Sequence, residues 1–462
     1  MAYKQYKKRW FLLLVVSLLN FSNAMTWITF APITYYTNIY YGNDNAATIY
    51  NVIFMALSIP LGILAMWGVD KFGIRPICII GSLINLIGNL LRVLGSAPFI
   101  TSMHWRFWIV AIGQTCAASA QPFIMYLPTK LAALWFAEDQ RVIANTISSM
   151  SNPLGVAVMY ALSPVFVNET HPDWFIELTS TVCALAVVTC VLSFGVTSSR
   201  PKTPPSSSSE QPSPLNFWKS IKQMFRNRAF LVLLLAVGSA VGLFNCLYNN
   251  LQPTLCSRGY SNKFTGLIGF GMILIGIAGA AIFGLIVDRT KKFLLIYKLC
   301  LVGTALSAIS LAIAFGQESS SVFVAISVLS FGFFGFPTYP LGLELAVETT
   351  YPIPEATASG SLICTGQILG ILYIVLTGEL NRQPSEHLKS IQTCVQIDKS
   401  IEVFEWQTSS FTWSGIVVLT AIFAIALFWP TYKRIEHENA QRVNQPEPYT
   451  LTITPRSFYS EE

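Results

Sequence analysis

Long apolar runs recur along this chain and leave it few ways to fold. Twelve of them are candidate spans, and several reach the ~20 residues that an α-helix needs to cross a bilayer. Backbone groups inside a bilayer find no water to bond, so only helices and closed β-barrels can span it. Most of the runs lack the alternating pattern of a barrel strand. We therefore predict an all-α membrane protein with twelve transmembrane helices.

The twelve predicted spans lie at 10–36, 47–69, 76–94, 108–127, 142–167, 175–196, 230–255, 267–287, 293–315, 322–343, 356–377 and 411–430. Only 11% of the residues are charged, whereas soluble proteins carry about 25%. Pro337 in the tenth run predicts a kink. Five glycines in the eighth run, at 269, 271, 276, 279 and 284, would let another helix pack closely. We expect residues 130–141 to form a loop with a short surface helix.

Two short, similar loops divide the chain into two halves. Each follows one apolar run, precedes another and places one carboxylate ahead of cations: Asp70, Lys71 and Arg75 in the first, and Asp288 and Arg289 in the second. The pattern resembles the loop signature of the major facilitator superfamily, which recurs between the second and third helices of each six-helix half. The alternative is two ordinary basic loops on the cytoplasmic side. The repeat favours the major facilitator fold with two pseudo-symmetric six-helix halves.

Composition predicts where these halves begin and end. We expect an N-terminal half at 1–197, a cytoplasmic linker at 198–228, a C-terminal half at 229–432 and a cytoplasmic tail at 433–462. Residues 198–214 are rich in Ser and Pro and cannot bury apolar area, so we expect disorder there. Residues 219–228 read as a basic amphipathic segment on the membrane surface.

Charge predicts the orientation. With both termini, the linker and both signature loops in the cytoplasm, that side holds all but seven of the 29 Lys and Arg residues. The glycosylation sequon at Asn168 then falls on the opposite side. We expect a multi-pass protein of the plasma membrane, without a cleaved signal peptide, glycosylated at Asn168. Cys256 and Cys394 flank expected external loops, and whether they form a disulfide is left open.

Polar residues deep inside the spans mark a candidate substrate site. Such residues are expensive in a bilayer, and transporter sites lie near the midplane between the two halves. The predicted site residues are Trp27, Gln121, Asn245, Tyr248 and Gln367. Aromatic faces and amide dipoles suit a cation with apolar groups, through cation–π contact, or a flat aromatic ligand. A dianion does not fit, because this depth lacks Arg and Lys. The alternative for each residue is a role in helix packing or at the lipid interface.

Carboxylates at the expected cytoplasmic ends carry a second hypothesis. We expect Asp70 and Asp288, with Lys71, Arg75 and Arg289, to act as latches that set the balance between inward-open and outward-open states. Glu344 and Glu348 lie one helical turn apart at the inner end of the tenth run. They would form a proton site or an inward gate, or else pair with a cation of a cytoplasmic loop.

The sequence gives little support to an enzyme. Its four His residues lie in expected loops or tails, and it holds no HExxH, phosphate-binding loop, nucleophile elbow or metal-spaced cluster. The net charge of +6 is assigned to membrane orientation rather than to nucleic acid. We therefore expect no catalysis, cofactor, metal or nucleic acid. The expected partners are a small-molecule substrate and the lipid bilayer, with the protein a monomer.

Several motifs resemble one transporter family. They are Asn23–Trp27, Ala120–Gln121, Lys130–Phe136, Ser151–Gly155 and Pro340–Glu348. They resemble the feline leukaemia virus subgroup C receptor-related transporters, solute carrier family 49, over about residues 8–432. Ser17–Ala24 and Lys130–Phe136 are most similar to the member 3 branch. The resemblance implies a facilitative carrier of the major facilitator fold. Better-known members are linked to haem export and to choline and ethanolamine transport.

The resemblance also implies a ligand cage. In the choline-carrying members a Trp, two Gln and a Tyr surround the ammonium, and Trp27, Gln121 and Gln367 match three of them. Asn245 stands at the Tyr position, so one aromatic wall is missing unless Tyr248 replaces it from the next turn. We expect alternating-access transport of a small organic solute, either haem or a choline- or ethanolamine-like amine. The alternatives are a receptor or scaffold without transport, and a proton-coupled antiporter of another metabolite using Glu344 or Glu348.

Overall fold

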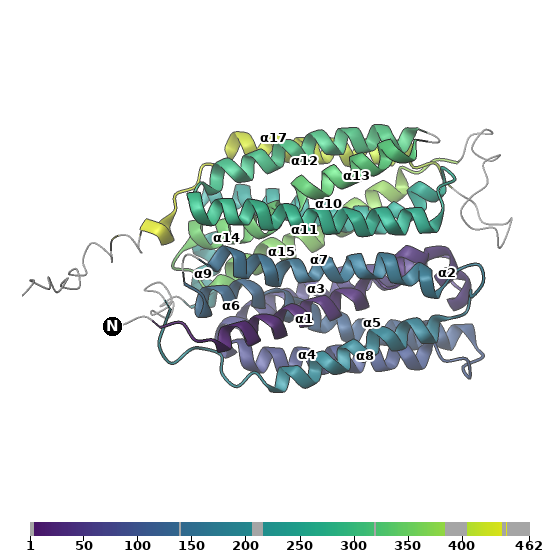
Figure 1. The fold of residues 1–462 in the computed structure, drawn as a ribbon, viewed down its shortest axis with the longest axis horizontal. Coiled ribbons are helices and arrows are strands. Elements are labelled where there is room, and N and C mark those ends of the chain that lie inside the picture. The colour runs from purple at the N-terminus through teal and green to yellow at the C-terminus, as the bar shows by residue number, and fades with distance from the viewer. Residues whose placement is uncertain are drawn as a thin grey trace, which may run out of the picture.

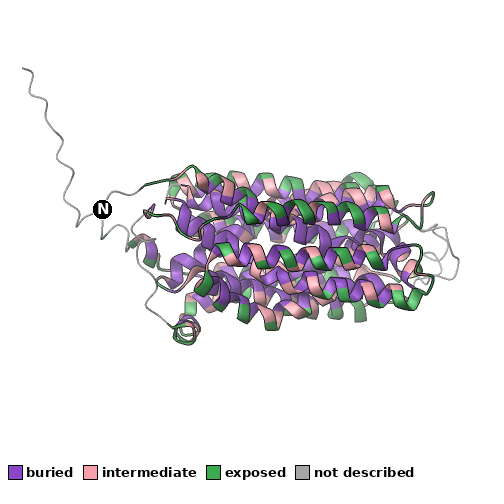
Figure 2. Cartoon of the chain, turned by 90° about the horizontal axis from the view of Figure 1, so that it is seen from below, coloured by how far each residue is buried: buried purple, intermediate pink, exposed green. Residues whose placement is uncertain are grey.

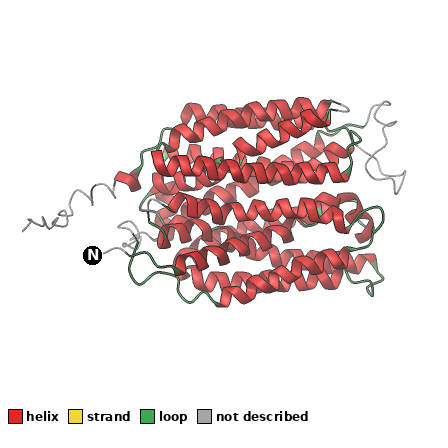
Figure 3. Cartoon of the chain, in the orientation of Figure 1, coloured by secondary structure: helices red, strands yellow, loops and turns green. Residues whose placement is uncertain are grey.

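The computed structural model describes residues 4–137, 140–205, 216–317, 320–383, 404–436 and 440. These residues fold into helices that run side by side in an elongated bundle (Figures 1 and 3). In the described part of the chain, the only strand-like pairing is an isolated bridge between Arg382 and Glu405. We call the end of the bundle that carries the N-terminus, α6 and α9 the inner end, and the opposite end the outer end.

The helices fall into two sets joined by α9 (Phe217–Met224). The first set is α1 (Lys8–Ile28), η1 (Ala31–Ile33), α2 (Thr34–Tyr41), α3 (Ala46–Phe72), α4 (Ile74–Gly95), α5 (Met103–Met125), α6 (Leu127–Trp135), α7 (Arg141–Phe166) and α8 (Phe175–Phe194). The second set is α10 (Arg228–Cys256), α11 (Asn262–Thr290), α12 (Phe293–Gly316), α13 (Ser321–Gly335), α14 (Thr338–Thr350), α15 (Glu355–Glu379) and α17 (Gln407–Leu427). They correspond to the two predicted halves.

Eleven helical segments in the described ranges are long and apolar enough to cross a membrane. The one predicted span outside these eleven, 142–167, is α7, which has 26 residues but a more polar composition. Asn145, Ser148, Ser149 and Asn152 are all buried in it, because α7 packs between α1 and α11 rather than against lipid. Exposed residues lie along the outside of the bundle in Figure 2. Many of them are large apolar residues, as contact with a bilayer requires.

Three spans are interrupted near prolines, which cannot donate a helical hydrogen bond. The first breaks at Pro32, the fourth between α5 and α6 next to Pro128, and the tenth at Pro337, where a kink was predicted. The expectation of a surface helix within 130–141 is wrong. Residues 127–135 form the buried helix α6, and the Lys130 side chain is inside because two carboxylates receive it.

Part of the expected disordered linker is packed on the N-terminal half. The Trp135 indole donates to the Ser199 carbonyl at 3.2 Å, and the Arg75 backbone N–H donates to the Ser199 hydroxyl at 3.0 Å. Tyr6 and Thr203 pair at 3.1 Å. The prediction of disorder is therefore wrong for 198–205, because polar residues can be held by hydrogen bonds where no apolar area is buried. Residues 206–215, including the serine run, lie outside the described residues.

Two pairs of helices form most of the contact between the halves. α3 packs against α15, and α7 packs against α11. The 3₁₀-helix η1 adds contacts to α10 and α11 towards the outer end, and α6 adds contacts to α15 at the inner end.

Glycines in α11 allow a close approach of α13, as the sequence predicted. A Cβ atom added at Gly279 would lie 2.3 Å from the carbonyl oxygen of Phe333, and one at Gly276 would lie 2.9 Å from that of Gly332. Backbone atoms cannot move aside as a flexible side chain can. The two helices therefore depend on small residues for their contact.

We expect Gly279→Ala to destabilise the protein by roughly 1–3 kcal/mol, because the added methyl group forces α11 and α13 apart. The measurement is thermal unfolding of the purified protein in detergent. Gly415→Ala in α17 is the matched control, since a Cβ there meets no atom within 4 Å and alanine favours a helix. Equal melting temperatures for the two variants would contradict this view of the interface.

Candidate functional site

Four of the five predicted substrate residues come together where the halves meet. The Trp27 ring of α1 and the Tyr248 ring of α10 form an edge-to-face pair with centroids 6.3 Å apart. One turn before Tyr248, the side-chain amide of Asn245 donates to Gln367 Oε1 of α15 at 3.4 Å. All of these side chains are buried. The ring pair thus joins the two halves, and the amide pair lies beside it within the C-terminal half.

Gln121 of α5, the fifth predicted residue, faces α3. Its Oε1 accepts a hydrogen bond from the Ser58 hydroxyl at 2.9 Å, which leaves its amide N–H groups as donors. In the described ranges no hydrogen bond joins Gln121 to the other four residues. It is nevertheless 3% exposed, so it belongs to the protein interior and not to the lipid interface.

Two asparagines that we did not predict connect this site across the halves. Asn51 of α3 donates from Nδ2 to Asn249 Oδ1 of α10 at 2.9 Å, and Asn249 donates from Nδ2 to the Asn245 carbonyl at 2.8 Å. The Trp27 indole donates to the Asn51 carbonyl at 3.3 Å. Both asparagines lie inside predicted spans, so the cost of a polar group in a membrane was a signal that could have found them.

A further cross-half contact lies beside Tyr248. The Tyr160 hydroxyl of α7 donates to the Tyr248 carbonyl of α10. Beyond Trp27, η1 packs against α10 and α11 and brings the halves together towards the outer end. The candidate site is therefore enclosed on that side by residues of both halves.

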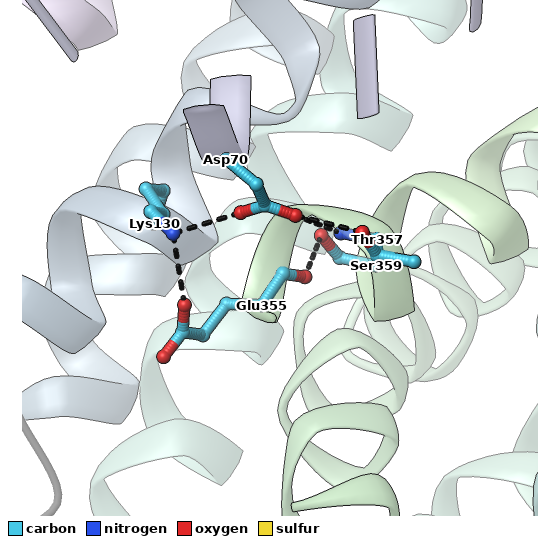
Figure 4. A network of polar contacts seen from close by, with 5 residues as sticks. All are labelled: Asp70, Lys130, Glu355, Thr357 and Ser359. Carbon is cyan, nitrogen blue, oxygen red and sulfur yellow. Dashed lines mark hydrogen bonds and ion pairs between the residues drawn. The ribbon is translucent and has the colours of Figure 1, made fainter. Parts of the chain in front are cut away.

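A cluster of charges closes the inner end (Figure 4). Lys130 Nζ of α6 lies 2.8 Å from Asp70 Oδ1 of α3 and 3.3 Å from Glu355 Oε2 of α15. Asp70 Oδ2 also accepts hydrogen bonds from the Thr357 backbone N–H at 3.1 Å and from its hydroxyl at 2.7 Å. Asp70 thus binds the N-terminal half to the first turn of a helix in the other half. We did not predict Lys130 or Glu355 as members of this latch.

The second signature loop repeats the contact in the opposite direction. Asp288 Oδ2, at the end of α11, accepts a hydrogen bond at 3.1 Å from the Ile143 backbone N–H in the first turn of α7. Both carboxylates therefore bond the third residue of a helix that belongs to the other half. Free N–H groups at a helix N-terminus attract negative charge, so each contact is electrostatic as well as a hydrogen bond.

The two loops also share an unusual turn. Gly73 and Lys291, each three residues after the signature carboxylate, have positive φ values of 82° and 56°. Each donates its backbone N–H to the carbonyl of the residue before that carboxylate, Val69 at 3.0 Å and Val287 at 2.7 Å. Both turns close with the same hydrogen bond, but ψ is −172° at Gly73 and 16° at Lys291, so only Lys291 is in the left-handed helical conformation.

Among the described residues, the cations predicted to act as latches do not take part in the hydrogen bonds and ion pairs between the halves. Lys71 Nζ sits 4.4 Å from the centroid of the Trp67 ring on its own helix, and the side chains of Arg75 and Arg289 are exposed. Contacts across the inner end thus come from the carboxylates, from Lys130 and from Glu355.

Glu344 and Glu348 face the segment that follows α17. Arg434 Nη1 lies 4.0 Å from Glu344 Oε1, and the Ile435 backbone N–H donates to Glu348 Oε2 at 3.3 Å. Of the roles considered, this geometry corresponds to a pairing with a cation on the inner side. The cation comes from the segment after the last helix and not from a loop between helices.

At the outer end, the predicted glycosylation site and one of the two predicted loop cysteines have bonding partners. Asn168, in the loop between α7 and α8, accepts hydrogen bonds at Oδ1 from the Thr170 backbone and hydroxyl. Cys256, at the end of α10, is disulfide-bonded, and Cys394 lies outside the described residues. Within the described ranges, no group of three or more His, Cys, Asp or Glu side chains could hold a metal ion.

Comparisons with known proteins agree on the class of molecule. The family description "Major Facilitator Superfamily" matches residues 12–373. Solute carrier family 49 member A3 of Xenopus tropicalis is 35% identical over 94% of this chain and 89% of its own length. The choline/ethanolamine transporter flvcr2b of Danio rerio is 29% identical over 81% of this chain and 78% of its own. The crystal structure of a D-xylose–proton symporter has a TM-score of 0.68 at 14% identity, covering 91% of this chain and 98% of that one.

Proposed function

The chain belongs to the major facilitator superfamily and, within it, to solute carrier family 49, and on that premise we propose that it carries a small amine-type organic cation across the membrane by alternating access. A transporter of this family moves a solute and performs no enzymatic reaction. The observation that carries the substrate class is the Trp27–Tyr248 ring pair at the meeting of the halves. Aromatic faces attract ammonium groups, and more strongly where water is excluded.

The remaining site residues support a polar organic solute. Gln121, Asn245 and Gln367 bring amides to a region that is otherwise apolar, and a transported ligand needs such groups for orientation. Choline and ethanolamine are named for the relative from Danio rerio, and we extend an amine of this class to the present chain. Haem carries two carboxylates, and none of the five site residues is cationic, so we do not propose it.

We further propose that the inner charge cluster is the cytoplasmic gate. The six-helix halves, proposed at 1–197 and 229–432, would rock about the site between them. Asp70 and Asp288 hold the inner side closed, and opening requires both to leave the helix starts that they bond. Glu344 and Glu348 bind the segment after α17, which supports a role in holding the inner end of the C-terminal half.

Radiolabelled uptake tests the proposed function. Purified protein in liposomes should accumulate or exchange labelled ethanolamine or choline, and a pH gradient should not drive the uptake. Gradient-driven uptake would favour the proton-coupled antiporter instead. A broad panel of small molecules should include one that raises the melting temperature, because ligand binding stabilises the folded state. If no compound does so and no uptake is seen, a receptor or scaffold role replaces transport.

We propose that the protein works as a monomer in the plasma membrane with both termini in the cytoplasm. The outer end then carries Asn168, which should be glycosylated. Expression of Asn168→Gln in animal cells should therefore give a band of higher mobility than wild type on a denaturing gel. Enzymatic removal of N-glycans should bring the two bands together. A wild-type band that the glycosidase does not shift would count against this orientation.

A further inference from the structure

Asn51 holds a hydrogen-bond acceptor that none of the described residues uses. Its side chain is 1% exposed, and its Oδ1 is buried without a hydrogen-bond partner. The same amide group donates through Nδ2 to Asn249 in the opposite half, so Oδ1 also lies where the halves meet. The backbone carbonyl of Asn51 receives the Trp27 indole. The unused acceptor thus belongs to the residue that joins Trp27 to α10.

The hydrogen bonds of neighbouring residues fix which way the side-chain amide of Asn51 points. Asn249 donates from Nδ2 to the Asn245 carbonyl, which can only accept. The Asn249 side chain must therefore place its Oδ1 towards Asn51, and Asn51 must donate to it from Nδ2. Turning the Asn51 amide over would bring two oxygens together. Oδ1 of Asn51 is thus left as the free acceptor.

Three other side-chain amide oxygens near this acceptor are already occupied. Gln121 Oε1 accepts from Ser58, Gln367 Oε1 accepts from Asn245, and Asn249 Oδ1 accepts from Asn51. Buried polar atoms in folded proteins almost always have a partner, and an exception calls for an explanation. A transported ligand that donates a hydrogen bond supplies one.

Resting on the proposed function, we infer that Asn51 Oδ1 accepts an N–H group of the solute's ammonium, so that the carrier prefers primary or secondary amines to quaternary ammonium ions. A primary ammonium offers up to three donors and can also face the Trp27 ring. A trimethylated ammonium offers the ring the same charge but has no N–H, and it leaves the acceptor unpaired. Sites built to pair with an N–H or O–H reject analogues without one.

The test compares 2-aminoethanol with its N-trimethyl analogue, choline, which differ in the nitrogen and share the hydroxyl. Binding is measured by thermal shift of the purified protein and by competition for uptake into liposomes. We expect wild type to bind 2-aminoethanol about tenfold or more tightly than choline. Asn51→Leu has a similar volume and no acceptor, so it should bring the ratio close to one by weakening 2-aminoethanol. Asn51→Asp keeps the acceptor and adds charge, and it should restore the preference.

Matched variants separate recognition from a structural role. Asn249→Leu breaks the same hydrogen bond between the halves but keeps the Asn51 carboxamide, which can still offer Oδ1 to the ligand, so it should keep the preference for 2-aminoethanol. Leu64→Ala, on the exposed face of α3, controls for expression and stability. The inference is overturned if both amines bind and the ratio is the same in wild type and Asn51→Leu. If neither amine binds wild type, the proposed amine substrate fails, and this assignment fails with it.

Discussion

Replacing Trp27 with alanine should abolish transport while leaving the protein folded and at the cell surface. The indole supplies the aromatic face that the N-terminal half places against Tyr248, and it donates the hydrogen bond to the Asn51 carbonyl. Cation–π contact in a desolvated site is worth about 2 kcal/mol, or about 30-fold in affinity, and buried Trp residues often contribute more. We therefore expect uptake to fall by at least tenfold.

The experiment measures initial uptake rates in cells, normalised to protein at the surface. Trp27→Phe keeps an aromatic face without the N–H group and should retain part of the activity. Trp108→Ala, on the exposed side of α5, removes an indole away from the site and should transport as wild type does. Uptake by Trp27→Ala at the wild-type rate would remove this residue from the substrate site.

The second large effect concerns the inner gate. Asp70→Asn leaves Lys130 with Glu355 as its only carboxylate partner in the described part of the chain, and it weakens the bond to the start of α15. Losing one member of a buried charge cluster is costly, although part of the cost is screened because Asp70 is not fully buried. We expect a shift of about tenfold towards the inward-open state.

A natural cysteine reports this shift. Cys364 of α15 is a free thiol, and it lies against Tyr126 and Gly62 where α15 meets α3. Opening of the inner end should expose it, so Asp70→Asn should raise its rate of labelling by a maleimide added from the cytoplasmic side. Labelling should vanish in the Cys364→Ser background.

Controls for the gate come from the same loop. Lys71→Ala removes a charge that stacks on Trp67 of its own helix, and it should leave the labelling rate unchanged. Asp70→Glu keeps the charge and should fall between wild type and Asp70→Asn. Asp288→Asn should act in the same direction as Asp70→Asn through its bond to α7. Equal labelling in wild type and Asp70→Asn would refute a gating role for the cluster.

The span pattern could be predicted because it depends on a single strong force. Exclusion of polar backbone from lipid fixes which runs become helices, and Pro337 locates a kink for a local reason. Lys130 shows where such reasoning fails. Lys130 is buried because Asp70 and Glu355 bind it. Glu355 is 225 positions away in the sequence, so no local sequence pattern predicts the cluster.

The site shows the same limit. Trp27, Asn245, Tyr248 and Gln367 could be proposed because each is polar or aromatic and deep in a span. The partnership between Asn51 and Asn249 could not, since two asparagines in different spans say nothing about which helices face each other. Which oxygen is left unpaired follows only from the directions of the surrounding hydrogen bonds.

The reciprocal placement of Asp70 and Asp288 has a mechanical consequence. Each half binds a helix start of the other half through one carboxylate, so a rigid rotation that stretches one of these contacts also stretches the second. The two contacts at the inner end are therefore coupled, and neither can break while the other stays intact. Opening of the inner end should accordingly be a single cooperative transition. Loss of one carboxylate should make this transition easier, but it should not populate a half-open state.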